Sequence, residues 1–200
     1  MTLLDTPPRR LADEILALDL LTLRDHTERA GDRIDPVAHR RRLDASIESG
    51  AACVVRRNGG LAAYALLRRE SAARWFVTGL STHPAHRTIT VVGELLAQLA
   101  ALAARMGIED LVSHVYKTNR LSMAFHRKLG FRITRENDKG VEFQASVATL
   151  AGHPAVRRVV DKHRDAARRS IGDPHPSRPD TPAFTPPGTL LRGIPPMPDR

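Results

Sequence analysis

Residues 80–96 read LSTHPAHRTITVVGELL, and this stretch decides the fold. An apolar strand ends at a His-Pro turn, and a short loop then leads into a long helix that carries Leu95 and Leu96 on its apolar side. A strand-to-helix junction directs unpaired backbone N–H groups and the positive end of the helix dipole outward. Such a junction can hold a pyrophosphate, although an ordinary connecting loop has the same pattern.

The segments downstream alternate between helix and strand. Residues 91–106 predict a helix that ends at Gly107. Its apolar stripe is formed by Val92, Leu95, Leu96, Leu99, Ala103 and Met106. Residues 111–116 predict a strand, and residues 119–129 predict a second helix. The inner side of that helix is predicted to carry Leu121, Ala124, Phe125 and Leu129. Residues 131–134 and 141–147 predict a closing hairpin.

The segments upstream predict two helices followed by an antiparallel meander. Residues 10–24 have apolar positions at helical spacing, and a second helix begins with Asp35 as its cap and ends at Gly50. Three short apolar runs predict strands over 51–56, 61–67 and 75–80. A chain of 200 residues is long enough for one such domain with extensions.

A second informative stretch, residues 119–131, reads NRLSMAFHRKLGF. Taken together, the two stretches resemble the GNAT superfamily of N-acetyltransferases over residues 10–148. The first motif is matched by Pro84, Arg87, Leu95 and Leu96, and the second by Asn119, Ser122, Phe125, Lys128, Gly130 and Phe131. The resemblance implies an α/β (α+β) fold, with a mixed, mostly antiparallel twisted sheet flanked by helices. Only Thr2 to Leu4 is available as the family's first strand.

The resemblance also implies that acetyl-CoA or another acyl-CoA is held in a gap between two central strands. Backbone atoms around Leu80 and Thr82 would pair with the pantetheine arm, and Arg87 would supply positive charge. The pyrophosphate would be held by the N–H groups of Thr88, Ile89, Thr90, Val91, Val92 and Gly93. Residues on the other side of the cofactor would be Asn119, Ser122 and Phe125.

Two positions in the phosphate loop depart from the family pattern. Thr90 and Val92 stand where the family usually has glycine, which lets a backbone approach a phosphate closely. A β-branched residue adds bulk at that surface, and Gly93 is expected to compensate in part.

His126 stands where the family commonly has a tyrosine that protonates the departing thiolate. A histidine can donate a proton near neutral pH, and a solvent-facing helix residue is the alternative interpretation. A step of about 100° per residue places His126 at the border of the predicted buried stripe, from where its ring could face the sulfur. The general base is open, with His83, His114 and Glu70 as candidates.

Composition limits the remaining classes of function. Cys53, the single cysteine, lies in an apolar run and is expected to be a small buried thiol. His83 and His86 have no third ligand at metal-site spacing, so no metal site is expected. The N-terminus lacks a secretory signal pattern, and no apolar run approaches the ~20 residues of a membrane span, so we expect a cytoplasmic protein.

The sequence changes character beyond Gly152. We expect residues 1–150 to form the acyltransferase domain, residues 151–171 a basic extension able to form a helix, and residues 172–200 a disordered tail. Prolines concentrate in the tail, and little apolar material is present to offset the entropy of ordering. The chain after Gly152 is therefore expected to be dispensable for folding.

The resemblance implies an N-acyltransferase that moves an acetyl or other acyl group from acyl-CoA to a small-molecule or peptide amine by direct attack. An acyl carrier protein is an alternative donor, because such carriers are acidic and the chain has a formal net charge of +9. A GNAT-like scaffold without catalysis is a further alternative. Nucleic-acid binding through residues 154–170 is disfavoured because Asp161 and Asp165 interrupt the basic run. Membrane binding is not expected, and the oligomeric state is open.

Overall fold

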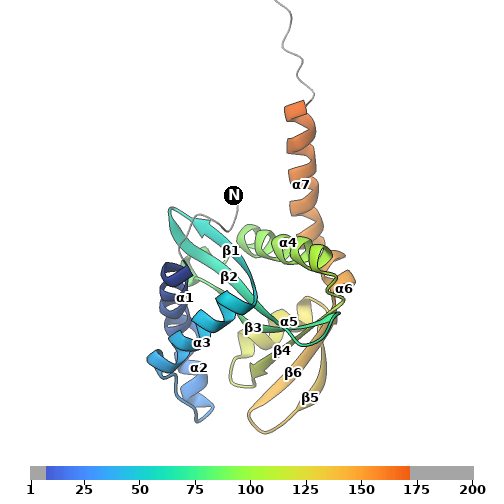
Figure 1. Ribbon diagram of the computed structural model, residues 1–200. Helices are drawn as coiled ribbons and strands as arrows, with labels where there is room; N and C mark the ends of the chain where they lie inside the picture. Colours follow the sequence, from blue (N-terminus) through green and yellow to red (C-terminus); the bar gives the residue numbers. More distant parts are fainter. Residues whose placement is uncertain (1–7, 172–200) are drawn as a thin grey trace, which may run out of the picture.

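The computed structural model describes residues 8–171, whose arrangement is shown in Figure 1. The predictions for residues 2–4 and for the proline-rich tail lie outside the described residues. The elements in chain order are α1 (Pro8–Thr22), α2 (Arg24–Arg29), α3 (Pro36–Ser49), β1 (Ala51–Arg57), β2 (Gly60–Arg69), β3 (Arg74–Thr82), the 3-10 turn η2 (Pro84–His86), α4 (Ile89–Met106), β4 (Asp110–Tyr116), α5 (Arg120–Lys128), β5 (Arg132–Glu136), β6 (Gly140–Ser146), α6 (Val147–Ala151) and α7 (Pro154–Ile171).

The six strands form one sheet in the order β1-β2-β3-β4-β6-β5. Neighbouring strands are antiparallel throughout, except that β3 and β4 are parallel. The predicted fold class, a mixed and mostly antiparallel sheet flanked by helices, is therefore confirmed. The short helix α6, directly after β6, is an element that the sequence pattern did not indicate.

Alternating side chains on β2 divide the core between the two faces of the sheet. Tyr64 and Leu66 pack with Ile15 of α1 and Leu43 of α3 in one cluster. Ala65 and its neighbours on the other face join a larger cluster with α4. Figure 1 shows α1 and α3 on the side of the sheet away from α4. We refer to these surfaces as the α1/α3 face and the α4 face.

Helix α4 lies on the sheet as a core helix. Its apolar stripe is buried as expected through Leu95, Leu96 and Leu99, and it ends at Gly107, whose φ of 65° is in the left-handed region. Met106 was expected in the stripe but is 43% exposed, and Leu102 is buried instead. With 18 residues, α4 is long and apolar enough to match a membrane span by composition, a test that core helices also pass.

Helix α5 buries only part of the predicted side. Leu129 is buried and Phe125 partly buried as predicted, but Leu121 is 55% exposed and Ala124 is exposed. His126 is buried in their place. The reason is an aromatic cluster on the α4 face of the sheet, where the His126 ring stacks on Phe143 with ring centroids 4.9 Å apart. The ring therefore lies inside the buried stripe, and the prediction that it lies at the border is wrong.

Helix α7 begins as part of the domain core. Val156 is 1% exposed and belongs to the cluster beneath α4. A Cβ atom on Gly93 would lie 3.0 Å from a methyl group of Val159 and 3.1 Å from the Ala155 carbonyl oxygen, so the two helices touch closely. The later turns of α7 extend away from the domain (Figure 1). The expectation that everything after Gly152 is dispensable for folding stays a prediction, and this contact argues against it for the first turns of α7.

Candidate active site

The two parallel strands pair over only part of their length. Residues Arg74–Val77 of β3 pair with Asp110–Ser113 of β4, and the register ends there. Beyond this point β3 stays paired with β2 as far as Thr82, and β4 stays paired with β6 as far as Tyr116. The facing edges of residues 78–82 and 114–116 therefore have no strand partner across the opening. We call this opening the strand gap.

The N-terminus of α4 provides hydrogen-bond donors next to the end of β3. Thr88 caps the helix, because its Oγ1 accepts from the Val91 N–H at 3.3 Å and its carbonyl accepts from the Val92 N–H at 3.0 Å. The N–H groups of Ile89 and Thr90 have no acceptor within the helix, as is usual for a first turn. Both residues are exposed. These donors and the helix dipole favour an anion at this end of α4.

The two departures from the loop glycines have unequal consequences. Val92 packs its side chain against the core, so its bulk is turned away from the phosphate-binding surface. Val91 is also buried, which leaves Thr90 as the departure that stays exposed at the first turn. The missing side chain of Gly93 makes room for α7, and its compensation for the lost loop glycines stays a prediction.

The residues expected along the cofactor arm precede residues 88–93, which we call the phosphate turn. Leu80 packs against the α4-face core, and Thr82 ends β3. Arg87 is exposed, and its Nη2 donates to the Thr82 carbonyl at 3.3 Å. The guanidinium thus lies between the end of β3 and the start of α4, where it adds positive charge beside the helix N-terminus.

The residues expected from α5 mainly organise that helix. Asn119 caps it, with Oδ1 accepting from the Ser122 N–H at 3.0 Å. Ser122 Oγ lies 3.3 Å from Nδ1 of His126, and Phe125 is partly buried against the core. The amide nitrogen of Asn119 remains as the group that could meet a ligand across the strand gap.

His126 is held as a neutral ring within the aromatic cluster. Its Nδ1 lies 2.8 Å from the Ser122 carbonyl oxygen, so Nδ1 carries the proton that it donates. Burial lowers the pKa of His126 below its ordinary value, and the bond to the Ser122 carbonyl offsets only part of that effect. As a general acid His126 would have to carry a second proton in this apolar setting. Its catalytic role is untested, and this setting argues against it.

Of the three candidate bases, His114 lies on an edge of the strand gap itself. It is the first β4 residue beyond the pairing with β3. Its ring lies on the α1/α3 face and makes a T-shaped contact with the ring of Phe76. His83 caps the turn η2 by accepting from the Ala85 N–H at 3.2 Å. Glu70 lies between β2 and β3, at the end of β3 that is remote from the gap.

A carboxylate supports the His114 ring. Glu142 Oε2 lies 3.3 Å from His114 Nε2, and Glu142 Oε1 accepts from the Thr134 hydroxyl at 2.7 Å. The Thr134 hydrogen bond, with smaller contributions from His114 and Arg135, lowers the pKa of Glu142 below its ordinary value. The side chain of His114 is 64% exposed, so its second nitrogen is open to solvent. The sequence pattern had not singled out Glu142.

His114 and Glu142 line a cavity of about 610 Å³ at the end of β4. The other residues that line it are Val115, Tyr116, Arg135, Glu136, Asn137, Lys139, Gly140 and Val141. Asp32, in the loop between α2 and α3, accepts from Lys139 Nζ at 2.7 Å and from the Tyr116 hydroxyl at 3.0 Å. That loop is therefore fastened to the rim of the cavity.

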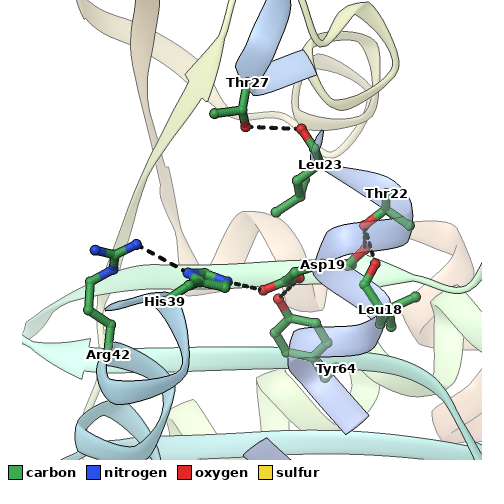
Figure 2. Close-up of polar contacts among 9 residues, drawn as sticks. Leu18, Asp19, Thr22, Leu23, Thr27, His39, Arg42 and Tyr64 are labelled. Atoms are coloured by element: carbon green, nitrogen blue, oxygen red, sulfur yellow. Dashed lines mark hydrogen bonds and ion pairs between the residues drawn. The ribbon is translucent and has the colours of Figure 1, made fainter. Parts of the chain in front are cut away.

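A buried polar network fixes α1 and α3 to the sheet on the same face (Figure 2). The Tyr64 hydroxyl donates to Asp19 Oδ1, and His39 Nε2 lies 2.8 Å from Asp19 Oδ2. Burial and the Asp19 carboxylate raise the pKa of Tyr64 well above its ordinary value. A Cβ on Gly79 would lie 2.9 Å from the Tyr64 hydroxyl, so β3 needs a glycine there. Asp19 follows Ile15 by four positions, so it lies on the apolar stripe of α1. An acid at such a position is the sequence signal that could have indicated the buried network.

Cysteine and metal-ligating side chains are two further kinds of reactive group within residues 8–171. Cys53 is buried as predicted, and burial raises the pKa of its thiol to about 12. Residues 8–171 contain no group of three or more His, Cys, Asp or Glu side chains arranged to hold a metal ion.

Solved structures with the same fold include several N-acetyltransferases. The PaiA N-acetyltransferase from Thermoplasma acidophilum in complex with coenzyme A has a TM-score of 0.58 and 12% identity, over 70% of this chain and 95% of that one. An aminoglycoside 6'-N-acetyltransferase complexed with coenzyme A has a TM-score of 0.56 and 13% identity, over 73% of this chain and 94% of that one. An aminoglycoside 6'-acetyltransferase type Ii has a TM-score of 0.55 and 16% identity, over 69% of this chain and 90% of that one.

The curated proteins contain no sequence that matches the chain. The sequence model described as "Acetyltransferase (GNAT) family" matches residues 17–131, which include the phosphate turn, both strands of the gap and α5. With that match over more than half its length, this chain belongs to the GNAT acetyltransferase family.

Proposed function

We propose that this protein is an active N-acyltransferase that uses acyl-CoA as donor and an amine as acceptor. The observation that carries the proposal is the strand gap, whose β3 edge leads into the N-terminus of α4 and whose β4 edge carries His114, which lines a cavity with Glu142. The chain's residues fit coenzyme A. The N–H groups of Ile89 and Thr90 suit its pyrophosphate, and the open strand edges suit its amide-bearing arm.

His114 is the proposed general base. When its Nε2–H donates to Glu142, the lone pair on Nδ1 is free to accept a proton. The Glu142 carboxylate fixes this tautomer and the orientation of the ring. His114 Nδ1 takes the proton from the acceptor amine as the new C–N bond forms and the C–S bond breaks. The departing thiolate then takes a proton from solvent and leaves as coenzyme A, and acyl-CoA, when bound, supplies the activated thioester.

The volume of the cavity favours an acceptor of small size. A volume of about 610 Å³ suits a small-molecule amine or the amine end of a peptide. The charges around the cavity are of both signs, with Glu136 and Glu142 near Arg135 and Lys139. We therefore propose the class of acceptor by size and by its reacting amine, and leave its identity to a screen.

The test begins with binding, using the full chain. Calorimetric titration should show binding of coenzyme A and of acetyl-CoA, and release of free thiol should then be followed with a panel of polyamines, amino acids, aminoglycosides and short peptides. An absence of binding would favour the scaffold reading or an acyl carrier protein as donor.

Variants at the cavity then test the base. For any acceptor that responds, His114→Ala should lower kcat by about a hundredfold or more. Glu142→Gln should lower it less and change its pH profile. The matched control is Glu136→Gln, because Glu136 lines the same cavity and pairs with Lys117 rather than His114. A His114→Ala variant with the turnover of the parent would remove His114 from the mechanism.

A further inference from the structure

The hydroxyl of Ser113 is buried at the inner end of the strand gap. Ser113 is the last β4 residue that pairs with β3, opposite Val77. Ser113 is 3% exposed, and its Oγ has no hydrogen-bond partner within residues 8–171. A buried hydroxyl without a partner is unfavourable and uncommon, so this one calls for an acceptor.

Ser113 and His114 occupy opposite faces of the sheet. Successive side chains along a strand alternate between faces, and the neighbours of Ser113 at two residues' distance, Leu111 and Val115, both pack into the core of the α4 face. Ser113 therefore lies on the α4 face. His114 lies on the α1/α3 face, against Phe76. The inner end of the gap thus has a hydroxyl on one side and the proposed base on the other.

A ligand in the gap must stop at Ser113. A chain that pairs with the open edges of residues 78–82 and 114–116 can advance only until β3 and β4 pair with each other, at Val77 and Ser113. The inner end of the ligand therefore meets the Ser113 hydroxyl. For the donor proposed above, the end opposite the pyrophosphate is the acyl group.

We propose that the Ser113 hydroxyl donates a hydrogen bond to the oxygen of the donor's acyl group. This inference rests on the proposed function, and it makes Ser113 an acyl-positioning residue. The bond orients the carbonyl carbon toward the face on which His114 lies. It also strengthens as negative charge develops on that oxygen during attack by the amine.

Two ligands that differ only in the acyl group test this role without any turnover. Acetyl-CoA and coenzyme A are titrated separately into the full-length parent, Ser113→Ala and Ser113→Thr. Ser113→Ala should bind acetyl-CoA about three- to tenfold more weakly than the parent, the usual value of one hydrogen bond, and should bind coenzyme A equally well. Ser113→Thr keeps the hydroxyl and should retain most of the affinity for acetyl-CoA.

The matched control is Ser81→Ala, which removes another buried strand hydroxyl beside the gap. Ser81 Oγ already has a partner, Thr22 Oγ1 at 2.9 Å, so its loss should not separate the two ligands. A Ser113→Ala protein that folds and keeps the parent's affinity for acetyl-CoA would show that Ser113 does not hold the acyl group. If the parent bound neither ligand, the proposed function would fail together with this inference.

Discussion

The Nδ1 atom of His126 lies 2.8 Å from the carbonyl oxygen of Ser122, one helical turn earlier. This bond and the stacking on Phe143 fill the ring's surroundings with structural contacts. We therefore expect His126 to be a structural residue and His126→Phe to keep kcat within about threefold of the parent. Loss of a general acid would typically lower kcat about a hundredfold or more. Steady-state turnover with an identified amine checks this. A hundredfold loss with normal affinity for coenzyme A, restored by His126→Tyr, would show that His126 is the acid after all.

The same residue predicts how stability depends on pH. Burial lowers the pKa of His126 in the folded protein, whereas in the unfolded chain it titrates near its ordinary value of 6.5. As the pH falls below that value, the unfolded chain takes up a proton that the folded protein does not. Stability is therefore lost on acidification, by at most about 1.4 kcal/mol per pH unit for one group, until the lowered pKa is reached.

Urea unfolding of the parent and of His126→Phe between pH 5 and pH 7 measures this contribution. The parent should lose stability toward pH 5 more steeply than the variant, in which the titrating ring is absent. Glu142 and Asp32 also have lowered pKa values, but carboxylates with ordinary values near 4 act at lower pH. Equal slopes for the two proteins in this window would remove His126 as the cause.

Much of the fold could be predicted because local patterns and the tertiary structure agree. Asp35 accepts from the Val37 N–H at 2.9 Å as the expected cap of α3, and Gly107 ends α4 with a positive φ. The strand boundaries followed the apolar runs for the same reason. These features depend on neighbours in the sequence, which the sequence shows directly.

The features that were missed depend on long-range contacts. Gly93 appeared to serve a phosphate, but its space is used by α7, more than sixty residues later. Glu142 became relevant only when the β4–β6 register placed it opposite His114. The buried side of α5 was misjudged because Phe143 attracts the His126 ring. Sequence spacing alone cannot supply such pairings.

Charge reversal at Arg87 should weaken binding of the cofactor. Its guanidinium is anchored to the Thr82 carbonyl beside the N-terminus of α4. We expect Arg87→Glu to raise the Kd for coenzyme A by about three- to tenfold at low salt, and by less at high salt because this charge is exposed. The control is Arg132→Glu, an equal change of net charge on the exposed strand β5. Equal effects of the two substitutions would mean that overall charge alone attracts the cofactor.

Removing the charge on Asp19 should loosen the attachment of α1 and α3. Its carboxylate accepts from Tyr64 and contacts His39 while being 2% exposed. Hydrogen bonds to a buried charged group are worth about 1.5–3 kcal/mol, so Asp19→Asn should lower the free energy of unfolding by an amount in that range. Asp13→Asn, on the same helix but 66% exposed, should change it by less than about 1 kcal/mol. Chemical denaturation measures both, and similar values would refute a special role for the buried network.

The contact between α4 and α7 predicts that the start of α7 stabilises the domain without taking part in cofactor binding. Val156 is 1% exposed, and full burial of a valine is worth about 1.5–3 kcal/mol, so Val156→Asp should lower the free energy of unfolding by at least that amount. Val160→Asp places the same carboxylate one turn later, at a residue that is 49% exposed, and should lower the free energy of unfolding far less.

Gly93→Ala puts a methyl group 3.1 Å from the Ala155 carbonyl oxygen, which forces the helices apart slightly. It should therefore lower the melting temperature while leaving the Kd for coenzyme A unchanged. If Gly93→Ala instead weakened coenzyme A binding at unaltered stability, the glycine would serve the phosphate turn and the role assigned to its contact with α7 would be wrong.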